Sequence, residues 1–317
     1  DTTPPTIVCV SATTRATPSN ACAYTVVGNE FDATAQDGCS TPSLKWTVSG
    51  ATTANGDTTM NGVVLAKGLN TITWVATDGC QLTNTCTFTV MVNDLTPPTI
   101  TTPAFALDAT IECGDATALA NALALVPQAT DACGTANLNI VSDSNAYACG
   151  ATYTQTRVWN FSDASGNTSA NYTQVITVVD STPPAITCTN GGTRATNAGT
   201  CGYTVVGTEF DATAEDACST PSLTWSVSGA TSANGENTMA GVVLNYGLNT
   251  VTWTATDACG LTSTCTLTVD VDTITTVTTL TVAPASQQYS DSVTMTATIT
   301  PYVCTGAAAV AGGPRHR

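Results

Sequence analysis

The stretch "EFDATAQDGCSTPSLKWTVSGATTANG", residues 30–56, returns as "EFDATAEDACSTPSLTWSVSGATSANG" at residues 209–235. The two copies are identical at 22 of 27 positions and lie 179 residues apart. An active site is seldom needed twice in one chain, whereas a structural module often is. The repeat therefore predicts a tandem array of one folded unit.

Three proline-containing segments mark the starts of these modules: "DTTPPTI" at residue 1, "DLTPPTI" at residue 94 and "DSTPPAI" at residue 180. A double proline is stiff and extended, and it cannot continue a helix. It suits a semi-rigid linker that opens an edge strand. The predicted modules are residues 1–93, 94–179 and 180–271, followed by an incomplete module at 272–317.

Period-two alternation of apolar residues is clear in the first module. "TITWVAT" (71–77) and "TCTFTVMV" (85–92) each place apolar side chains on one face. Further strands fit residues 6–10, 23–28, 44–49 and 62–66. About seven short strands per module are typical of an immunoglobulin-like β-sandwich. The predicted fold is thus all-β: tandem immunoglobulin-like sandwiches in a head-to-tail, disulfide-rich rod.

Two segments depart from this pattern. "DATALANALALVP" (115–127) predicts a short helix that begins after Asp115 and ends before Pro127. Residues 272–317 offer two strands, at 278–282 and 292–300. Because two strands cannot bury an apolar face alone, we expect the protein to continue beyond Arg317. Completion by a strand from a second subunit is the alternative.

The composition excludes several function classes. The formal net charge is −16 with seven Lys and Arg, which argues against nucleic-acid binding. No run of 18 apolar residues predicts a membrane span. The single histidine is His316, so no Ser-His-Asp or Cys-His arrangement can form within the modules. Glu30 and Asp32 lie two apart on one face, unlike the facing carboxylates of glycosidases. We expect no enzyme.

Tryptophans recur at equivalent positions and could be interpreted as a sugar-binding platform. Trp46 and Trp74 lie on apolar faces of their predicted strands, however, so packing in the core is the stronger interpretation. The same holds for their copies, Trp225 and Trp253.

Fourteen cysteines indicate an oxidising compartment and a disulfide framework. The modules hold five, three and five cysteines and the last segment one, so the odd counts rule out pairing confined to modules. Thr102 and Tyr172 replace Cys9 and Cys86 in the middle module, which favours a bond between those two. Cys22–Cys39 stays open as a rival pairing. The predicted pairs are Cys9–Cys86, Cys39–Cys80, Cys22–Cys133, Cys113–Cys149, Cys188–Cys265, Cys218–Cys259 and Cys201–Cys304.

Aspartates recur at three equivalent places in each module: the linker and two loops at one end. Such a trio supplies the oxygen ligands that calcium prefers. The alternative is that each carboxylate caps its own turn, as aspartates in loops commonly do. The only cofactor predicted is therefore calcium at module junctions. The candidate ligands are Asp1, Asp37, Asp78, Asp94, Asp131, Asp163, Asp180, Asp216 and Asp257.

Two kinds of glycosylation signal are present. The first is a cluster of N-x-[ST] triplets in "NFSDASGNTSANYT". The second is a D-[ST]-x triplet like the O-glycosylation pattern of secreted proteins from bacteroidetes. The candidates are Asn160, Asn167, Asn171, Thr2, Thr58, Ser181, Thr273 and Ser292.

The segments "TPPTIVC", "ATDGC", "ATDACG", "TCTFTV" and "TCTLTV" together resemble the hyalin-repeat (HYR) family and its bacterial surface-protein relatives. The resemblance covers residues 1–271, and residues 278–301 resemble the opening strands of another bacterial Ig-like repeat. It implies spacer or adhesive units of long secreted adhesins, gliding-motility proteins or fibre-forming proteins. The family brings no catalytic residues.

The resulting hypothesis is a secreted or cell-surface structural protein: a rigid filament or an adhesin stalk of disulfide-stapled repeats. Its expected partners are other copies of itself or further repeats of a longer chain. The alternative is an array of modules that bind surface glycans or proteins, accessory to a secreted enzyme. An exposed aromatic cluster would favour the binding array, and threonine-rich faces favour the structural rod.

Overall fold

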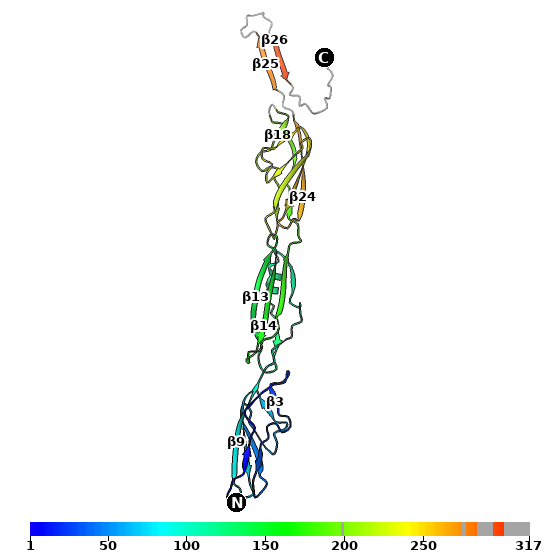
Figure 1. Cartoon of the computed structure of the whole chain (residues 1–317). Helices are drawn as coiled ribbons and strands as arrows, with labels where there is room; N and C mark the ends of the chain where they lie inside the picture. The colour runs from blue at the N-terminus through cyan, green and yellow to red at the C-terminus, as the bar shows by residue number, and fades with distance from the viewer. Residues whose placement is uncertain (198–199, 274–276, 284–293, 301–317) are drawn as a thin grey trace. The chain divides into compact units, whose positions relative to one another are not determined.

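A computed structural model of the chain describes residues 1–197, 200–273, 277–283 and 294–300, with side chains as far as Asp272 (Figure 1). The chain divides into two compact units, and the middle module contributes to both. Two loops of the middle module, residues 110–116 and 147–153, group with the third module. The first unit is Asp1–Ala109, Thr117–Ala146 and Thr154–Ile176; the second is Thr110–Ala116, Tyr147–Tyr153 and Thr177–Arg317.

Residues 1–93 form a β-sandwich in the first unit. Its larger sheet has the order β2-β9-β8-β5-β6, and β2 runs parallel to β9. The short sheets β1-β4 and β3-β7 supply the other side of the core. The strands are β1 (Thr6–Val8), β2 (Thr13–Ala16), β3 (Ala23–Thr25), β4 (Thr34–Gln36), β5 (Ser43–Gly50), β6 (Ala54–Asp57), β7 (Val64–Ala66), β8 (Gly68–Thr77) and β9 (Thr83–Asn93).

The alternation expected from the sequence places the core. Every second side chain of β8 from Asn70 to Ala76 is buried. Trp74 is fully buried and donates its indole N–H to the carbonyl of Phe31 at 3.0 Å. Trp46 is buried as well, and a side chain at Gly56 would collide with its ring. The tryptophans are core residues, as predicted.

Residues 180–271 repeat this sandwich within the second unit. The larger sheet has the order β17-β24-β23-β20-β21, and β16-β19 and β18-β22 are the small sheets. Trp225 and Trp253 are buried like their copies. The strands are β16 (Ala185–Thr187), β17 (Gly192–Ala195), β18 (Gly202–Thr204), β19 (Thr213–Glu215), β20 (Ser222–Gly229), β21 (Ala233–Glu236), β22 (Val243–Asn245), β23 (Gly247–Thr256) and β24 (Thr262–Thr273).

The middle module has a smaller sheet, of order β11-β15-β14-β13, and a two-stranded sheet β10-β12. The predicted helix is present as α1 (Ala116–Ala124), and Gln174 of β15 fixes it by donating to the carbonyl of Ala122 at 3.2 Å. The strands are β10 (Thr99–Ile100), β11 (Ala109–Glu112), β12 (Ala129–Thr130), β13 (Asn137–Tyr147), β14 (Tyr153–Ser162) and β15 (Tyr172–Val179); after the third module, β25 (Val277–Ala283) pairs with β26 (Thr294–Thr300).

Candidate functional site

Two disulfides join the middle module to the third module inside the second unit. Cys113 bonds to Cys218 and Cys149 bonds to Cys259, with Cα atoms 5.6 and 5.0 Å apart. The predictions Cys113–Cys149 and Cys218–Cys259 are therefore wrong. The reason is that residues 110–116 and 147–153 pack on the third module, so each cysteine meets a partner across the boundary before one in its own module.

The other pairings have mixed outcomes. Cys9–Cys86 and Cys188–Cys265 are bonded as predicted. Cys39 and Cys80 are two separate exposed thiols, so neither the Cys39–Cys80 prediction nor the rival Cys22–Cys39 is correct. Cys22 and Cys133 are near each other but are not joined, and the Cys133 thiol donates to the carbonyl of Ala21 at 3.5 Å. The predicted Cys201–Cys304 pair lies outside the described residues because Cys304 does.

We call the contact between the first and middle modules the first junction; it lies within the first unit. The ammonium of Lys67 lies 3.4 Å from the Asp94 carboxylate and donates to the Ser165 hydroxyl at 2.9 Å. Ser165 in turn donates to Asp94 at 3.3 Å. The Asp94 side chain is fully buried, so this cation and hydroxyl compensate a carboxylate that water does not reach.

Asp163 of the first junction is also partnered, whereas Asp131 keeps a buried Oδ2 with no partner. Asp163 accepts backbone N–H groups through Oδ1, and its Oδ2 accepts the amide N–H of Asn167 at 2.8 Å. Although burial pushes the pKa of Asp163 upward, these hydrogen bonds and the charge of Lys67 hold it below its ordinary value. Burial, the Cys22 thiol and the charge of Asp94 raise the pKa of Cys133 to about 12. Cys133 is therefore protonated at neutral pH.

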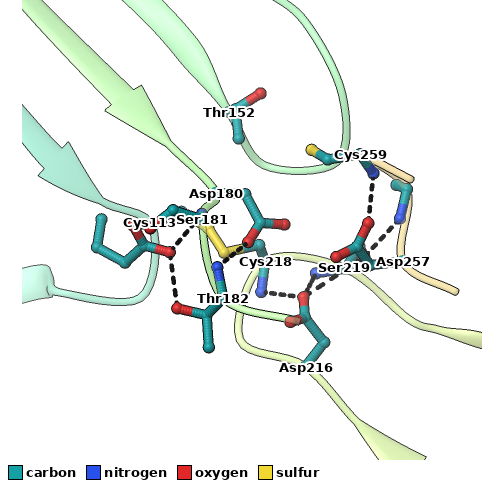
Figure 2. The surroundings of a disulfide bond; sticks show 12 residues. Cys113, Thr152, Asp180, Ser181, Thr182, Asp216, Cys218, Ser219, Asp257 and Cys259 are labelled. Atoms are coloured by element: carbon teal, nitrogen blue, oxygen red, sulfur yellow. Dashed lines mark hydrogen bonds between the residues drawn. A yellow bond between two sulfur atoms is a disulfide. The ribbon is translucent and has the colours of Figure 1, made fainter. Parts of the chain in front are cut away.

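We call the contact between the middle and third modules the second junction; it lies within the second unit (Figure 2). Asp180, Asp216 and Asp257 converge there, with one carboxylate oxygen of each within 4.8 Å of the others. Oδ1 of each accepts a backbone N–H two residues further on, so the turn-capping interpretation is correct for all three. Asp180 and Asp257, however, each keep a buried Oδ2 with no partner.

The charge at the second junction is uncompensated. Among the described residues, no Lys or Arg forms an ion pair with these three aspartates. Burial raises the pKa of Asp180 above its ordinary value, and the charges of Asp216, Asp257 and Glu112 add to the shift against the hydrogen bond from Thr182. The geometry thus matches a cation site: two oxygens sharing one calcium ion lie at most about 5 Å apart.

Glu112 completes the second junction and was not singled out by the sequence. Its carboxylate accepts the backbone N–H and the hydroxyl of Ser181, both at 2.8 Å, and the hydroxyl of Thr182 at 3.0 Å. Hydrogen bonds, chiefly the one from the backbone N–H of Ser181, hold the pKa of Glu112 below its ordinary value. A pocket of about 340 Å³, lined by Glu112, Asp216 and Cys218 among others, opens beside the aspartates. Of the three aspartates, Asp216 lines this pocket.

The other two predicted trios converge only in part. One ligand atom each of Asp94, Asp131 and Cys133 lies within 4.8 Å of the others. Asp163 instead accepts a hydrogen bond from the Asn167 amide. Asp1 and Asp37 group with Cys39, and Asp78 is not among them. In the described part of the chain, the full trio is therefore assembled at the second junction alone.

The glycosylation candidates differ in accessibility. Asn167 donates its amide to Asp163 and to the carbonyl of Asp94, which is incompatible with a glycan on that nitrogen. Ser181 uses its hydroxyl on Glu112. Ser292 and the side chain of Thr273 lie outside the described residues. Asn160 is half-buried, whereas Asn171, Thr2 and Thr58 are exposed.

The paired carboxylates of each large module have structural roles. Glu30 accepts from Arg15 at 2.8 Å and from the Tyr24 hydroxyl at 2.6 Å. Asp32 caps the backbone N–H of Met60 at 2.7 Å. The copies, Glu209 and Asp211, make the same contacts with Arg194, Tyr203 and Met239. These carboxylates join the two sides of each sandwich.

Comparison with known sequence families gives two matches. Residues 101–178 match the family described as "HYR-like domain with 4 cysteines", and residues 179–271 match the "HYR domain". Together they account for more than half of the chain. The chain carries HYR and HYR-like domains over residues 101–271. The HYR resemblance drawn from the sequence motifs is thus confirmed.

The four-cysteine description sharpens the contrast between the junctions. Residues 101–178 contain three cysteines, and "SDASGN" at the end of β14 has Ser165 where the third module's "TDACGL" has Cys259. Ser165 thus stands where the third module has Cys259, and its hydroxyl accepts from Lys67 and donates to Asp94. The sequence signal for this was available: D-A-S-G against D-A-C-G.

Among individual proteins, this HYR chain is 37% identical over 139 residues to hyalin of Strongylocentrotus purpuratus. That match covers 41% of this chain and 11% of hyalin, so the chain spans a small part of that relative's length. Solved structures with similar folds include mouse cadherin-23 EC22-24 (18% identity, TM-score 0.31, 86% of this chain and 99% of that one). Another is Drosophila N-cadherin EC1-4 (12%, TM-score 0.23, 86% and 77%).

HYR domains indicate an extracellular, adhesion-type module, and the family is not a family of enzymes. Among the described residues, no helix is both long enough and apolar enough to cross a membrane.

Proposed function

We propose that the chain is a structural segment of an extracellular filament or adhesin stalk, in which neighbouring HYR modules are locked together. The observation that carries this proposal is the pair of bonds Cys113–Cys218 and Cys149–Cys259. An ordinary interface between domains leaves relative motion. One disulfide between two modules still permits one module to rotate relative to the other, whereas two disulfides at separate points prevent this rotation.

We also propose that the second junction holds a divalent cation, with calcium as the best fit. Asp180, Asp216 and Asp257 would hold it through the carboxylate oxygens that their turn-capping bonds leave over. Calcium accepts six to eight oxygen ligands, and water reaching the pocket can complete such a shell. The bound cation would neutralise a cluster that now has no positive partner, and so stabilise the junction.

The test of the structural role compares two disulfide losses in the full chain. Cys149→Ser with Cys259→Ser removes a staple between modules; Cys9→Ser with Cys86→Ser removes a bond within a module. Small-angle scattering should show a broader distribution of interatomic distances for the first variant and an unchanged one for the second. Equal distributions for the unmodified chain and the first variant would contradict the locking role. Binding to a glycan array with no such broadening would favour the alternative function.

A further inference from the structure

Cys39 and Cys80 of the first module are the copies of Cys218 and Cys259. Their loops are built in the same way. The N–H groups of Cys39 and Cys218 donate to Asp37 and Asp216 at 2.9 and 2.8 Å. Cys80 and Cys259 donate to the aspartates two residues before them, both at 2.8 Å. The first module therefore presents its two thiols on the same scaffold as the stapled pair.

The two loops are also fixed to each other identically. The hydroxyl of Ser40 accepts the N–H of Gly79 at 2.9 Å, and that of Ser219 accepts the N–H of Ala258 at 3.0 Å. What differs is the partner. Cys218 and Cys259 are bonded to the middle module, whereas Cys39 and Cys80 are exposed thiols.

We infer that Cys39 and Cys80 are a covalent docking site for a further HYR module that carries two Cys-Gly loops like those of the middle module. In the second junction these loops are Cys113–Gly114 and Cys149–Gly150. Both glycines have positive φ, of 89° and 55°. A Cβ on Gly114 would lie 2.9 Å from Ala217, and one on Gly150 would lie 2.9 Å from the carbonyl of Cys218. The partner must therefore have glycine after each cysteine.

A third feature of the partner follows from Glu112. This residue precedes Cys113 and accepts from the hydroxyls of Ser181 and Thr182, which follow Asp180 in the chain. The first module has Thr2 and Thr3 at the same positions, and Thr2 and Thr3 are exposed. A partner with the sequence Glu-Cys-Gly would place its carboxylate on these two hydroxyls. The recognition motif is thus Glu-Cys-Gly in one loop and Cys-Gly in the other.

Among the described residues, no other cysteine of the chain meets this need. Cys113 and Cys149 are already bonded, and Cys22 and Cys133 are near each other. Formation of each new bond converts two thiols to one disulfide, releasing two protons and two electrons. An oxidised thiol carrier, such as glutathione disulfide, accepts the electrons and becomes two thiols. The inference extends the proposed structural role, and the second junction would remain stapled if it failed.

The experiment adds a second copy of residues 94–179 directly before Asp1 of the full chain, matching the way residues 94–179 precede Asp180. After oxidation in glutathione buffer, nonreducing peptide mapping should join Cys39 and Cys80 to the added module's two Cys-Gly loops. The native Cys113–Cys218 and Cys149–Cys259 bonds in the same molecule report that mapping and oxidation worked. Changing both glycines of the added loops to valine should leave Cys39 and Cys80 as thiols.

A second format does not depend on the added module folding. The full-length Cys218→Ser with Cys259→Ser variant, which frees Cys113 and Cys149, is mixed with the unmodified chain. We expect a disulfide-linked heterodimer that maps to Cys39 and Cys80, and loss of that product when both are changed to serine. If Cys39 and Cys80 stay free in both formats while the native bonds form, the inference is wrong.

Discussion

The two junctions use one aspartate framework, and among the described residues a side-chain cation pairs with it at the first junction alone. At the first, the ammonium of Lys67 and the hydroxyl of Ser165 serve the buried Asp94. At the second, Cys259 occupies the position of Ser165 and forms a disulfide, and two buried carboxylate oxygens, on Asp180 and Asp257, have no partner, against one, on Asp131, at the first. The junction that has serine at this position thus also has Lys67 as an internal cation. We infer that a positive charge stabilises a junction of this type: Lys67 supplies it at the first, and we propose that calcium supplies it at the second.

The two solutions also differ in strength. A disulfide typically contributes about 2–4 kcal/mol to stability, whereas a partly exposed ion pair contributes about 0–1 kcal/mol. Lys67 is 29% exposed, so its pair with Asp94 falls between an exposed and a buried bridge. We therefore expect the second junction to be the stronger and the first to be the place where the modules separate.

The largest effect should come from removing the staple that the first junction lacks. Cys149→Ser with Cys259→Ser should lower the free energy of unfolding by about 2–5 kcal/mol, because the constraint on the unfolded chain is lost. Cys133→Ser is the matched control, since Cys133 is not bonded, and should cost far less. Urea titration followed by tryptophan fluorescence measures both. Equal losses of unfolding free energy in the double variant and in Cys133→Ser would contradict the expected difference between the junctions.

Calcium should give the next largest effect, and at the second junction. A ligand at about 100 times its dissociation constant stabilises the folded state by about 2.7 kcal/mol. We expect added calcium to raise the melting temperature of the metal-free chain and EDTA to reverse this. Asp257→Asn should abolish the increase. Asp163→Asn is its control at the first junction and should retain it; a calcium response that survives Asp257→Asn would place the ion elsewhere.

The sequence predicted most of the fold, because period-two alternation in segments such as 71–77 and 85–92 is strong and local. The strands β2, β4 and β6 escaped prediction. They are three or four residues long with little apolar alternation, and they exist because a neighbour pairs with them, as Val90 of β9 does with Thr13. Periodicity carries no information about such pairing.

At the site, the sequence predicted the trio Asp180, Asp216 and Asp257 because the repeat itself aligns the three positions. The disulfides across the second junction could not be obtained in that way. Their geometry depends on which loops of two modules meet, and the spacing of cysteines within a module does not contain that information. Lys67 was missed for the same reason: its partner Asp94 lies in the next module.

A smaller effect is expected from Lys67. Lys67→Met leaves the buried Asp94 carboxylate without its cation; breaking a fully buried pair costs about 3–5 kcal/mol, and partial exposure of Lys67 reduces the expected loss to about 1–3 kcal/mol. Adding Asp94→Asn should recover much of it, because the uncompensated charge is then gone. Tyr246 occupies the position of Lys67 in the third module, so Tyr246→Met is the matched control. Chemical denaturation should be measured for the unmodified chain, Lys67→Met, Lys67→Met with Asp94→Asn, and Tyr246→Met. An unchanged free energy of unfolding for Lys67→Met would contradict the comparison.

The smallest effect is a pH dependence that differs in sign with and without the cation. The pKa of Asp180 is raised in the folded chain by burial and by Asp216, Asp257 and Glu112. In EDTA the folded state therefore binds a proton that the unfolded chain, with a pKa of about 3.9, still releases. Stability should rise as the pH falls from 7 through the folded pKa of Asp180, and the gain should be complete below about 3.9. Glu112 and Asp163, whose pKa values are lowered, act oppositely, but only near and below their ordinary values. Between pH 7 and about 5 the Asp180 contribution should dominate this balance.

Asp180→Asn should remove the rise in stability at falling pH. Saturating calcium should replace the rise with a fall, because protons displace the ion. Melting curves at stepped pH measure all three, and identical slopes for the unmodified chain and Asp180→Asn in EDTA would show that the second junction carries no excess negative charge.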